Sequence, residues 1–284
     1  MMRIFDINGQ YFIGRPSSRD DYRRFLDQAE VVGLVLSGID LKLSHSNDFP
    51  FMSEFRTSNA QARDFIAELD DTRVVPFFFV DPRQADAARQ VEQAARDGFR
   101  GIKMYPPQGW FPDEPRVLDA FRAAQEQDLP VFLHMGRTSA HPQLRSIYAM
   151  PARLEGMGLV CPRLKVILGH FAAPWSLEAS ALSKSFRFYF DLSTSGSLST
   201  EAIRFAARCP DLGIERLVLG TNGTGANNMD LARGTVERLR VCGLSEEQIA
   251  KVASDNALAL LGLDGAFARS QSAQVTGVNH AANR

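Results

Sequence analysis

Four side chains at or just beyond the ends of short apolar runs could carry out proton transfer or polarise a substrate. They are Lys103, His134, His170 and Asp191. A histidine can act as a general base near neutral pH, and a lysine can stabilise a developing oxyanion. Without a metal ion, one of the histidines or Asp191 would have to activate water. Such a set suits hydrolysis of an activated ester or lactone, or lyase chemistry beside a carboxylate, better than hydrolysis of an unactivated amide.

Other polar residues near the same run ends are candidates for substrate binding. Asp6 alternates with Asn8 and Gln10, so the three side chains would share one face of a strand. Arg137 closely follows His134 and could clamp a carboxylate with two parallel hydrogen bonds. The substrate-binding candidates are Asn8, Gln10, Tyr105, Arg137, Ser193 and Asn222.

Each candidate also has a purely structural interpretation. Asn8 and Gln10 could be turn residues that satisfy backbone groups. Lys103 could extend to solvent along its aliphatic stem. Asp191 could be a buried carboxylate that serves the barrel, and Arg137 could be a solvated loop charge.

Eight apolar runs must position these side chains. Most are continuous rather than alternating, as in strands that are buried on both faces. Eight strands alternating with helices predict a single parallel (β/α)8 TIM barrel, whose catalytic residues lie at the C-terminal ends of the strands. A doubly wound sheet is the alternative, but Asn8-Gly9-Gln10 is not the Gly-rich turn that it needs. The runs span residues 4–7, 31–36, 74–80, 101–105, 131–135, 166–169, 188–192 and 217–220.

Helical patterns fill the intervals between these runs. Two of them open with a capping box, Ser58 with Gln61 and Ser245 with Gln248, which can satisfy free N–H groups at a helix start. Apolar residues recur on one face of the others. The expected helices span residues 58–69, 84–96, 115–127, 229–241 and 245–253.

Bulk composition excludes several classes of protein. The net charge is -1, so no nucleic-acid partner is implied. Cys161, Cys209 and Cys242 lack metal-like or disulfide-like spacing, which favours a reducing compartment. No apolar run is long enough to span a bilayer, and the N-terminus carries no basic-then-apolar leader. We therefore expect a cytoplasmic protein with no membrane partner.

Five short segments form an ordered series on the predicted strands and the final helix. They are Gly101-Ile102-Lys103-Met104-Tyr105-Pro106, Pro130-Val131-Phe132-Leu133-His134-Met135-Gly136, Leu168-Gly169-His170-Phe171, Tyr189-Phe190-Asp191-Leu192-Ser193 and Asp255-Asn256-Ala257-Leu258-Ala259-Leu260-Leu261. From Arg3 to Leu263 the chain resembles the amidohydrolase-related family, in the decarboxylase-like branch of the amidohydrolase superfamily. This resemblance implies hydrolysis or decarboxylation of small, often carboxylate-bearing substrates at a metal ion. It also implies a homo-oligomer, as a homodimer.

The first and last strands depart from that family's metal-binding pattern. By position, His134 matches the strand-five ligand, and His170 matches the strand-six histidine that contacts substrate or metal-bound water. The family's two first-strand histidines are replaced by Asn8 and Gln10, and its strand-eight aspartate is replaced by Asn222. Carboxamides are neutral and weak ligands for zinc-like ions. We therefore expect no metal cofactor, with a divalent metal such as zinc as the alternative.

Three functional hypotheses follow, and whether the chain is an enzyme stays open among them. The first is a metal-independent hydrolase or carbon–carbon lyase that acts on a small carboxylate- or lactone-containing molecule. The second is a non-catalytic descendant that binds a ligand or a partner protein. The third is a hydrolase or decarboxylase that holds a metal through rearranged ligands, for instance His134, His170 and Asp191.

We expect one barrel domain over residues 1–268 and a disordered tail over residues 269–284. Substrate identity would lie in the loops over residues 37–56, 106–115 and 137–150, where His141 is a candidate rim residue. Two of these loops are rich in large apolar side chains, which could form a substrate wall, a lid or a subunit contact. These side chains are Phe49, Phe51, Met52, Phe55, Trp110 and Phe111.

Overall fold

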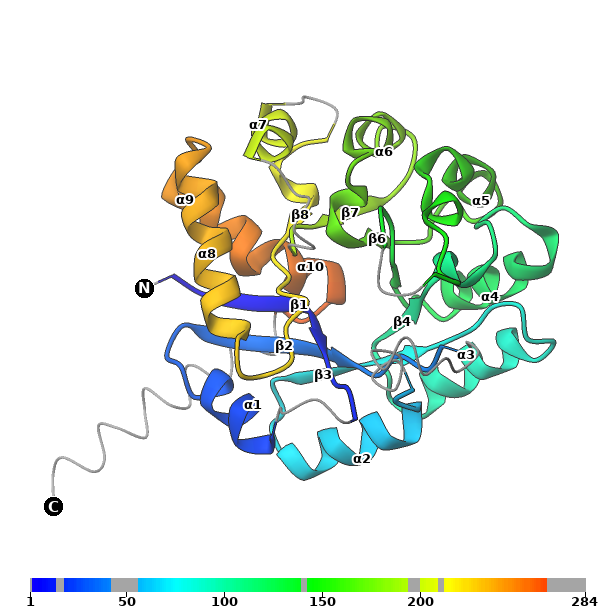
Figure 1. Ribbon diagram of the computed structural model, residues 1–284, viewed down its shortest axis with the longest axis horizontal. Coiled ribbons are helices and arrows are strands. Elements are labelled where there is room, and N and C mark those ends of the chain that lie inside the picture. The colour runs from blue at the N-terminus through cyan, green and yellow to red at the C-terminus, as the bar shows by residue number, and fades with distance from the viewer. Residues whose placement is uncertain are drawn as a thin grey trace, which may run out of the picture.

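Eight parallel strands form a nearly closed barrel at the centre of the molecule, in the order β1 to β8 (Figure 1). This computed structural model describes residues 2–13, 18–41, 56–138, 142–193, 200–208 and 212–264. The predicted (β/α)8 barrel is confirmed, whereas the predicted tail at 269–284 lies outside the described residues. The strands are β1 (Ile4–Gln10), β2 (Val31–Ser37), β3 (Val74–Phe79), β4 (Gly101–Met104), β5 (Val131–Leu133), β6 (Val166–Leu168), β7 (Phe188–Asp191) and β8 (Leu217–Val218).

Backbone hydrogen bonds also join β1 to the segment that follows β8. The N–H of Ile7 donates to the carbonyl of Leu219 at 3.0 Å, and the N–H of Asn222 donates to the carbonyl of Asn8 at 2.8 Å. We call this junction the β1–β8 seam. Since it brings the first and last strands together, residues separated by more than two hundred positions become neighbours.

From β3 onward, each strand ends one or two residues earlier than the end of the apolar run that predicted it. The last residues of these runs are still buried, for example Val80, Met135 and Leu219, each with 0% exposure. They leave the hydrogen-bonded ladder but continue into the packed interior. An apolar run therefore predicts burial, and strand pairing covers only part of it.

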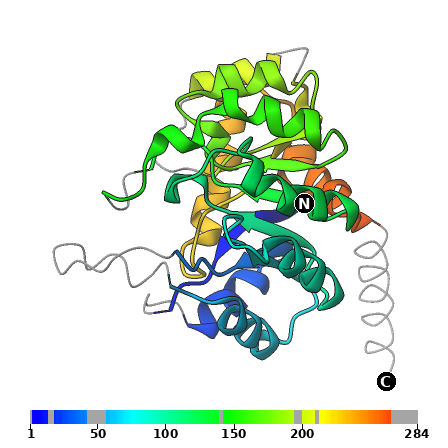
Figure 2. The same ribbon diagram turned by 90° about the vertical axis from the view of Figure 1, so that its right-hand side faces the viewer.

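Most helices surround the barrel wall (Figures 1 and 2), while the last one, α10, lies beside β1 and β8 (Figure 1). None in the described ranges is both long enough and apolar enough to cross a membrane. The α-helices are α1 (Arg19–Leu26), α2 (Asn59–Leu69), α3 (Ala87–Arg96), α4 (Pro115–Glu126), α5 (Leu154–Val160), α6 (Ser176–Leu182), α7 (Thr200–Arg208), α8 (Asn228–Val241), α9 (Glu246–Ala250) and α10 (Asn256–Leu261). Short 3₁₀ segments are η2 (Pro106–Gln108), η3 (Ser146–Ala149), η4 (Pro151–Arg153), η5 (Gly169–Ala172) and η6 (Ile214–Arg216), and η7 (Lys251–Asp255) is a π-helix.

The predicted helix starts are confirmed where a capping box marks them. Ser58 and Ser245 each accept a hydrogen bond from the backbone N–H three residues on, and each box is complete. A third box, Ser18 with Asp21, opens α1 and was not predicted. The predicted helix over residues 245–253 continues through η7 into α10, so it forms one longer unit.

One apolar cluster joins the barrel strands to α10. Phe5 and Phe132 belong to it together with Leu258, and all three are buried. The side-chain amide of Asn256 donates to the carbonyl of Leu217 at 2.7 Å, which fixes the start of α10 against β8. The C-terminal helix is therefore part of the barrel core.

Candidate active site

Lys103, Asn8, Asp191, Ser193 and His170 form one buried hydrogen-bonded chain at the carboxyl ends of their strands. Lys103, which is only 3% exposed, donates from Nζ to Asn8 Oδ1 at 2.9 Å. Asn8 Nδ2 donates to Asp191 Oδ2 and to Ser193 Oγ, both at 3.1 Å. All five residues were candidates from the sequence, and the barrel brings them together from positions far apart in the chain.

Asp191 is the acceptor at the centre of this chain. Its Oδ1 accepts from the Ser193 N–H at 2.9 Å, and its Oδ2 accepts from the His170 N–H at 3.2 Å. The Ser193 hydroxyl also donates to Asp191 Oδ2 and lies 2.9 Å from His170 Nδ1. Gly220 packs directly on the carboxylate, because a Cβ there would lie 2.1 Å from Asp191 Oδ1.

The backbone at His170 adopts a left-handed conformation. His170, Phe171 and Ala172 have φ values of 55°, 52° and 51°. Such values are uncommon in residues other than glycine and persist where surrounding contacts hold them, often at functional sites. Here the hydrogen bond from the His170 N–H to Asp191 is one of those contacts.

His134 lies beside this chain, in contact with two other rings. Its ring centroid is 4.8 Å from that of His170 in an edge-on arrangement, and 4.1 Å from that of Tyr105 in a stacked one. His134 Nε2 is buried and has no hydrogen-bond partner within the part of the chain that the structure describes. A buried polar atom of this kind is costly unless a ligand or water satisfies it.

Burial sets the electrostatics of the site. It lowers the pKa of Lys103 from 10.5 to about 7, against the attraction of Asp191 and Asp6. Burial, reinforced by His170 and Lys103, holds the pKa of His134 well below its usual range. Burial also lowers the pKa of His170, although Asp191 opposes the shift. At neutral pH both imidazoles are therefore uncharged and carry a lone pair that can accept a proton.

Gln10 and Asn222 bind each other across the β1–β8 seam. Gln10 Nε2 donates to Asn222 Oδ1, and Asn222 has a left-handed φ of 56°. Both residues were predicted to be near the site, and they border it through the backbone hydrogen bond between Asn222 and Asn8. Tyr105 lies at the site through its stacking on His134, and burial raises the pKa of its phenol to about 12.

Asp6 was predicted only to share a strand face with Asn8 and Gln10, and its partners across the seam were not predicted. Asp6 Oδ1 accepts from the N–H groups of Asn8 and Thr221, at 3.0 and 2.9 Å. Asp6 Oδ2 accepts from Thr221 Oγ1 at 2.6 Å and from Asn228 Nδ2 at 2.9 Å. Pairing of β1 with β2 is irregular between Asp6 and Gly9, so Asp6 and Asn8 have separate sets of side-chain partners. Thr221 adjoins Asn222 and could have been found by position, but no motif marks Asn228.

The structure does not bring Arg137 into the buried cluster. Its side chain is exposed, while its backbone N–H donates to the Ala173 carbonyl at 2.8 Å. His141 and the large apolar residues Phe49, Phe51, Met52 and Phe55 lie outside the described residues.

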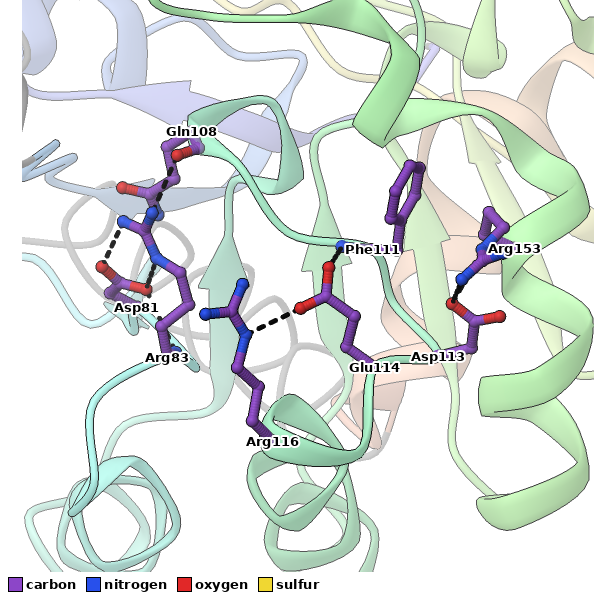
Figure 3. Close-up of polar contacts among 8 residues, drawn as sticks. All are labelled: Asp81, Arg83, Gln108, Phe111, Asp113, Glu114, Arg116 and Arg153. Atoms are coloured by element: carbon purple, nitrogen blue, oxygen red, sulfur yellow. Dashed lines mark hydrogen bonds and ion pairs between the residues drawn. The ribbon is translucent and has the colours of Figure 1, made fainter.

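The aromatic loop after β4 is anchored to the barrel wall. Trp110 has 0% exposure and packs in the core. It therefore serves the barrel's packing and does not fit a substrate wall, a lid or a subunit contact. Arg83 pairs with Asp81 and donates to the Gln108 carbonyl at 2.8 Å, and Glu114 accepts from the Phe111 N–H at 2.8 Å (Figure 3). These contacts fix the loop that follows Lys103 and Tyr105.

The donors at the family's metal positions do not fit a metal ion. Among the described residues, no three His, Cys, Asp or Glu side chains are grouped so that they could hold one. The oxygen of Asn8 faces the Lys103 amine, and Asp191 already accepts from four donors. Carboxamides and a nearby lysine make a weak site for a divalent cation.

Comparison with known proteins places this barrel in a family. A family model for amidohydrolases matches residues 47–263. The chain belongs to the amidohydrolase family. The match begins after β2, so it contains Lys103, His134 and His170 but leaves out Asn8 and Gln10 of β1. In a search of curated proteins, no sequence matches the chain.

Several solved structures share this amidohydrolase barrel at low identity. A TIM-barrel protein from Bordetella bronchiseptica superposes with a TM-score of 0.69 and 18% identity over 93% of this chain and 100% of that chain. A Pseudomonas putida protein, provisionally assigned as a 2-pyrone-4,6-dicarboxylic acid hydrolase, gives 0.64 and 18% over 93% and 99%. The 5-carboxyvanillate decarboxylase of Novosphingobium aromaticivorans, solved with bound manganese, gives 0.60 and 17% over 92% and 97%. At these identities the likeness shows the fold.

Proposed function

We propose that this amidohydrolase-family protein is a metal-independent hydrolase or lyase that acts on a small carboxylate- or lactone-containing molecule. One observation carries the proposal. A buried lysine stands next to the replaced metal position at Asn8, within a chain that ends on a neutral histidine. The site therefore combines a cationic group with a proton acceptor.

The side chains divide into two roles in this proposal. In hydrolysis, His170 or His134 removes a proton from water as the water oxygen attacks the substrate carbonyl. The charge that develops on the carbonyl oxygen is stabilised by the Lys103 ammonium in a buried, low-dielectric setting. Protonation of the leaving oxygen by the histidinium completes the ring opening of a lactone.

The structural neighbours favour carboxylate-bearing substrates. The name of the Pseudomonas putida protein describes a lactone with two carboxylates, and that of the Novosphingobium aromaticivorans enzyme describes an aromatic acid. A carboxylate can pair with Lys103 and with the amide N–H groups of Gln10 or Asn222. Tyr105, stacked on His134, and Arg137, whose side chain is exposed, complete the proposed binding residues.

Turnover of a panel of lactones and aromatic carboxylic acids, assayed with protein of known metal content, tests the proposal. His134→Ala and His170→Ala should each lower kcat by roughly 10²–10⁴-fold, the usual contribution of a general base. Ser245→Ala, in the capping box of α9, should leave kcat unchanged. Undiminished turnover in both histidine variants would refute their roles.

Two other functions give different results in the same assays. A non-catalytic ligand-binding protein would return every bound compound unchanged. A metal enzyme with rearranged ligands would contain stoichiometric zinc, iron or manganese after purification without chelator. The observation that favours the metal alternative is that His134 Nε2 has no hydrogen-bond partner among the described residues.

A further inference from the structure

The buried chain contains enough hydrogen-bonding constraints to assign the proton on His170. Each contact along it has a donor and an acceptor, and several of these groups can play only one of the two roles. The assignment begins with Asn8, whose amide orientation must be inferred from its neighbours. Asp191 accepts on one side of Asn8, and Lys103 donates on the other. Both neighbours require Asn8 Nδ2 to point toward Asp191 and Ser193.

The next step fixes the hydroxyl proton of Ser193. Its Oγ lies within hydrogen-bond distance of Asn8 Nδ2, Asp191 Oδ2 and His170 Nδ1. Asn8 Nδ2 can only donate to it. Asp191 Oδ2 also accepts from two N–H groups, so it acts as an acceptor here. The single Ser193 proton is therefore directed to Asp191.

The last step concerns His170 Nδ1. It lies 2.9 Å from Ser193 Oγ and 3.4 Å from the Ser193 carbonyl oxygen. The carbonyl can only accept, and the hydroxyl proton is already directed to Asp191. Both neighbours of Nδ1 are thus acceptors, so Nδ1 must carry the proton and Nε2 must carry the lone pair.

We propose that Ser193 is a positioning residue that holds His170 in the Nδ1–H tautomer, with Asp191 as the acceptor that orients the hydroxyl. Under the proposed function, on which this inference rests, His170 Nε2 is then the atom that takes the proton from water. Asn8 has a defined part in this arrangement, because it fills the second acceptor position on Ser193 Oγ and links the chain to Lys103.

The tautomer can be measured without any substrate. In protein labelled with ¹⁵N-histidine, protonated and unprotonated ring nitrogens have well-separated ¹⁵N shifts, and loss of one set of signals in His170→Gln assigns His170. We expect a protonated Nδ1 and an unprotonated Nε2 at neutral pH in the wild type. In Ser193→Ala both shifts should move toward intermediate or reversed values.

A matched control removes a similar hydroxyl-to-carboxylate hydrogen bond in the segment that follows β8. Thr221→Ala deletes the hydroxyl that donates to buried Asp6, and it should leave the His170 shifts unchanged. If Ser193→Ala does not fold, Ser193→Cys keeps the side-chain volume with a much weaker hydrogen-bonding group. An Nε2–H tautomer in the wild type, or unchanged His170 shifts in a folded Ser193 variant, would overturn the inference.

Kinetics separate this inference from the proposed function. With a turned-over substrate, Ser193→Ala should lower kcat by roughly tenfold to a hundredfold, less than loss of the base itself, with little change in KM. If the tautomer shifts as expected but His170→Ala retains full turnover, the positioning by Ser193 stands and the catalytic role of His170 fails.

Discussion

Lys103 illustrates how the charge state of one residue controls what the site can bind. Its Nζ lies 2.9 Å from Asn8 Oδ1 and 4.8 Å from the centre of the Phe132 ring. The ring and the amide solvate an ammonium less well than water does, so the proton is held weakly despite Asp191 and Asp6 nearby. The result is a lysine that titrates near neutral pH.

Carboxylate binding should therefore weaken as pH rises. With a folded-state pKa of about 7 in the free protein, Lys103 is cationic below that pH and neutral above it. A carboxylate that binds only the cation should lose affinity about tenfold per pH unit above 7, because binding then requires uptake of one proton. Calorimetric titration with isophthalate from pH 6 to 9 measures this dependence. Lys103→Met should bind weakly at every pH, and an equal slope in that variant would contradict the prediction.

Gly220 is the residue that tolerates least change beside the site. An added Cβ would meet Asp191 Oδ1 at 2.1 Å and Asn8 Cβ at 2.9 Å. Gly220→Ala should lower the free energy of unfolding by about 1–3 kcal/mol through overpacking, and it should displace the carboxylate. Urea unfolding measures the loss. Gly234→Ala, in α8 with open space around it, should instead stabilise by about 0.5–1 kcal/mol.

Among the elements, α2 shows how a local sequence signal determines a helix boundary. Ser58 accepts from the Gln61 N–H, while the Gln61 side chain accepts from the Ser58 N–H at 2.9 Å. Ser58→Ala should lower the free energy of unfolding by about 1 kcal/mol, since it removes one of these partners. Thermal unfolding measures the change, and Ser58→Asp should recover most of it. No difference between the Ala and Asp variants would contradict a capping role.

Element positions were predictable where local pattern and tertiary environment agree. The eight apolar runs correspond to the eight strands, because most residues on both faces of these strands are buried. The π-helix at Lys251–Asp255 was not predicted, because the sequence shows only an ordinary helical pattern over residues 245–253.

Prediction of the site was less complete than prediction of the strands, because several of its contacts depend on tertiary structure. Position at a strand end was enough to find Lys103, His170 and Asp191, because barrels collect strand ends at one rim. The contact of Asn8 with all of its partners depends on the register of β1, which sequence patterns do not specify. Asn228, which contacts Asp6, lies at the start of α8 and is well separated in the sequence from any strand end.

At the scale of the whole molecule, closure of the barrel relies on polar as well as apolar contacts. β8 is only two residues long, so it provides little ladder of its own. Three hydrogen bonds to Asp6 supplement it and link β1 to Thr221 and to the start of α8. Burial raises the pKa of Asp6 to about 6, although the hydrogen bonds from Thr221 and Asn8 oppose the shift.

Asp6→Asn should destabilise the fold by about 2–3 kcal/mol. Either orientation of the new amide turns its N–H₂ toward groups that now donate to the carboxylate, which leaves buried donors unpaired. Urea unfolding by two spectroscopic probes measures the loss. Thr221→Ser, which keeps the hydroxyl, should cost much less, and an Asn variant as stable as the wild type would disprove the role of Asp6.

Cytoplasmic location and a homodimeric state stay predictions that fractionation and light scattering can test.

The pairing of Gln10 with Asn222 has a consequence for redesign of this barrel. Gln10 supplies the donor and Asn222 the acceptor, so Asn222→Asp keeps this hydrogen bond, whereas a carboxylate at position 10 would face another acceptor. Acquiring ion-binding chemistry at position 10 therefore requires a change at Asn222 as well, and the Lys103 amine beside Asn8 opposes a cation there. A stepwise route that begins at residue 222 preserves the contact across the junction.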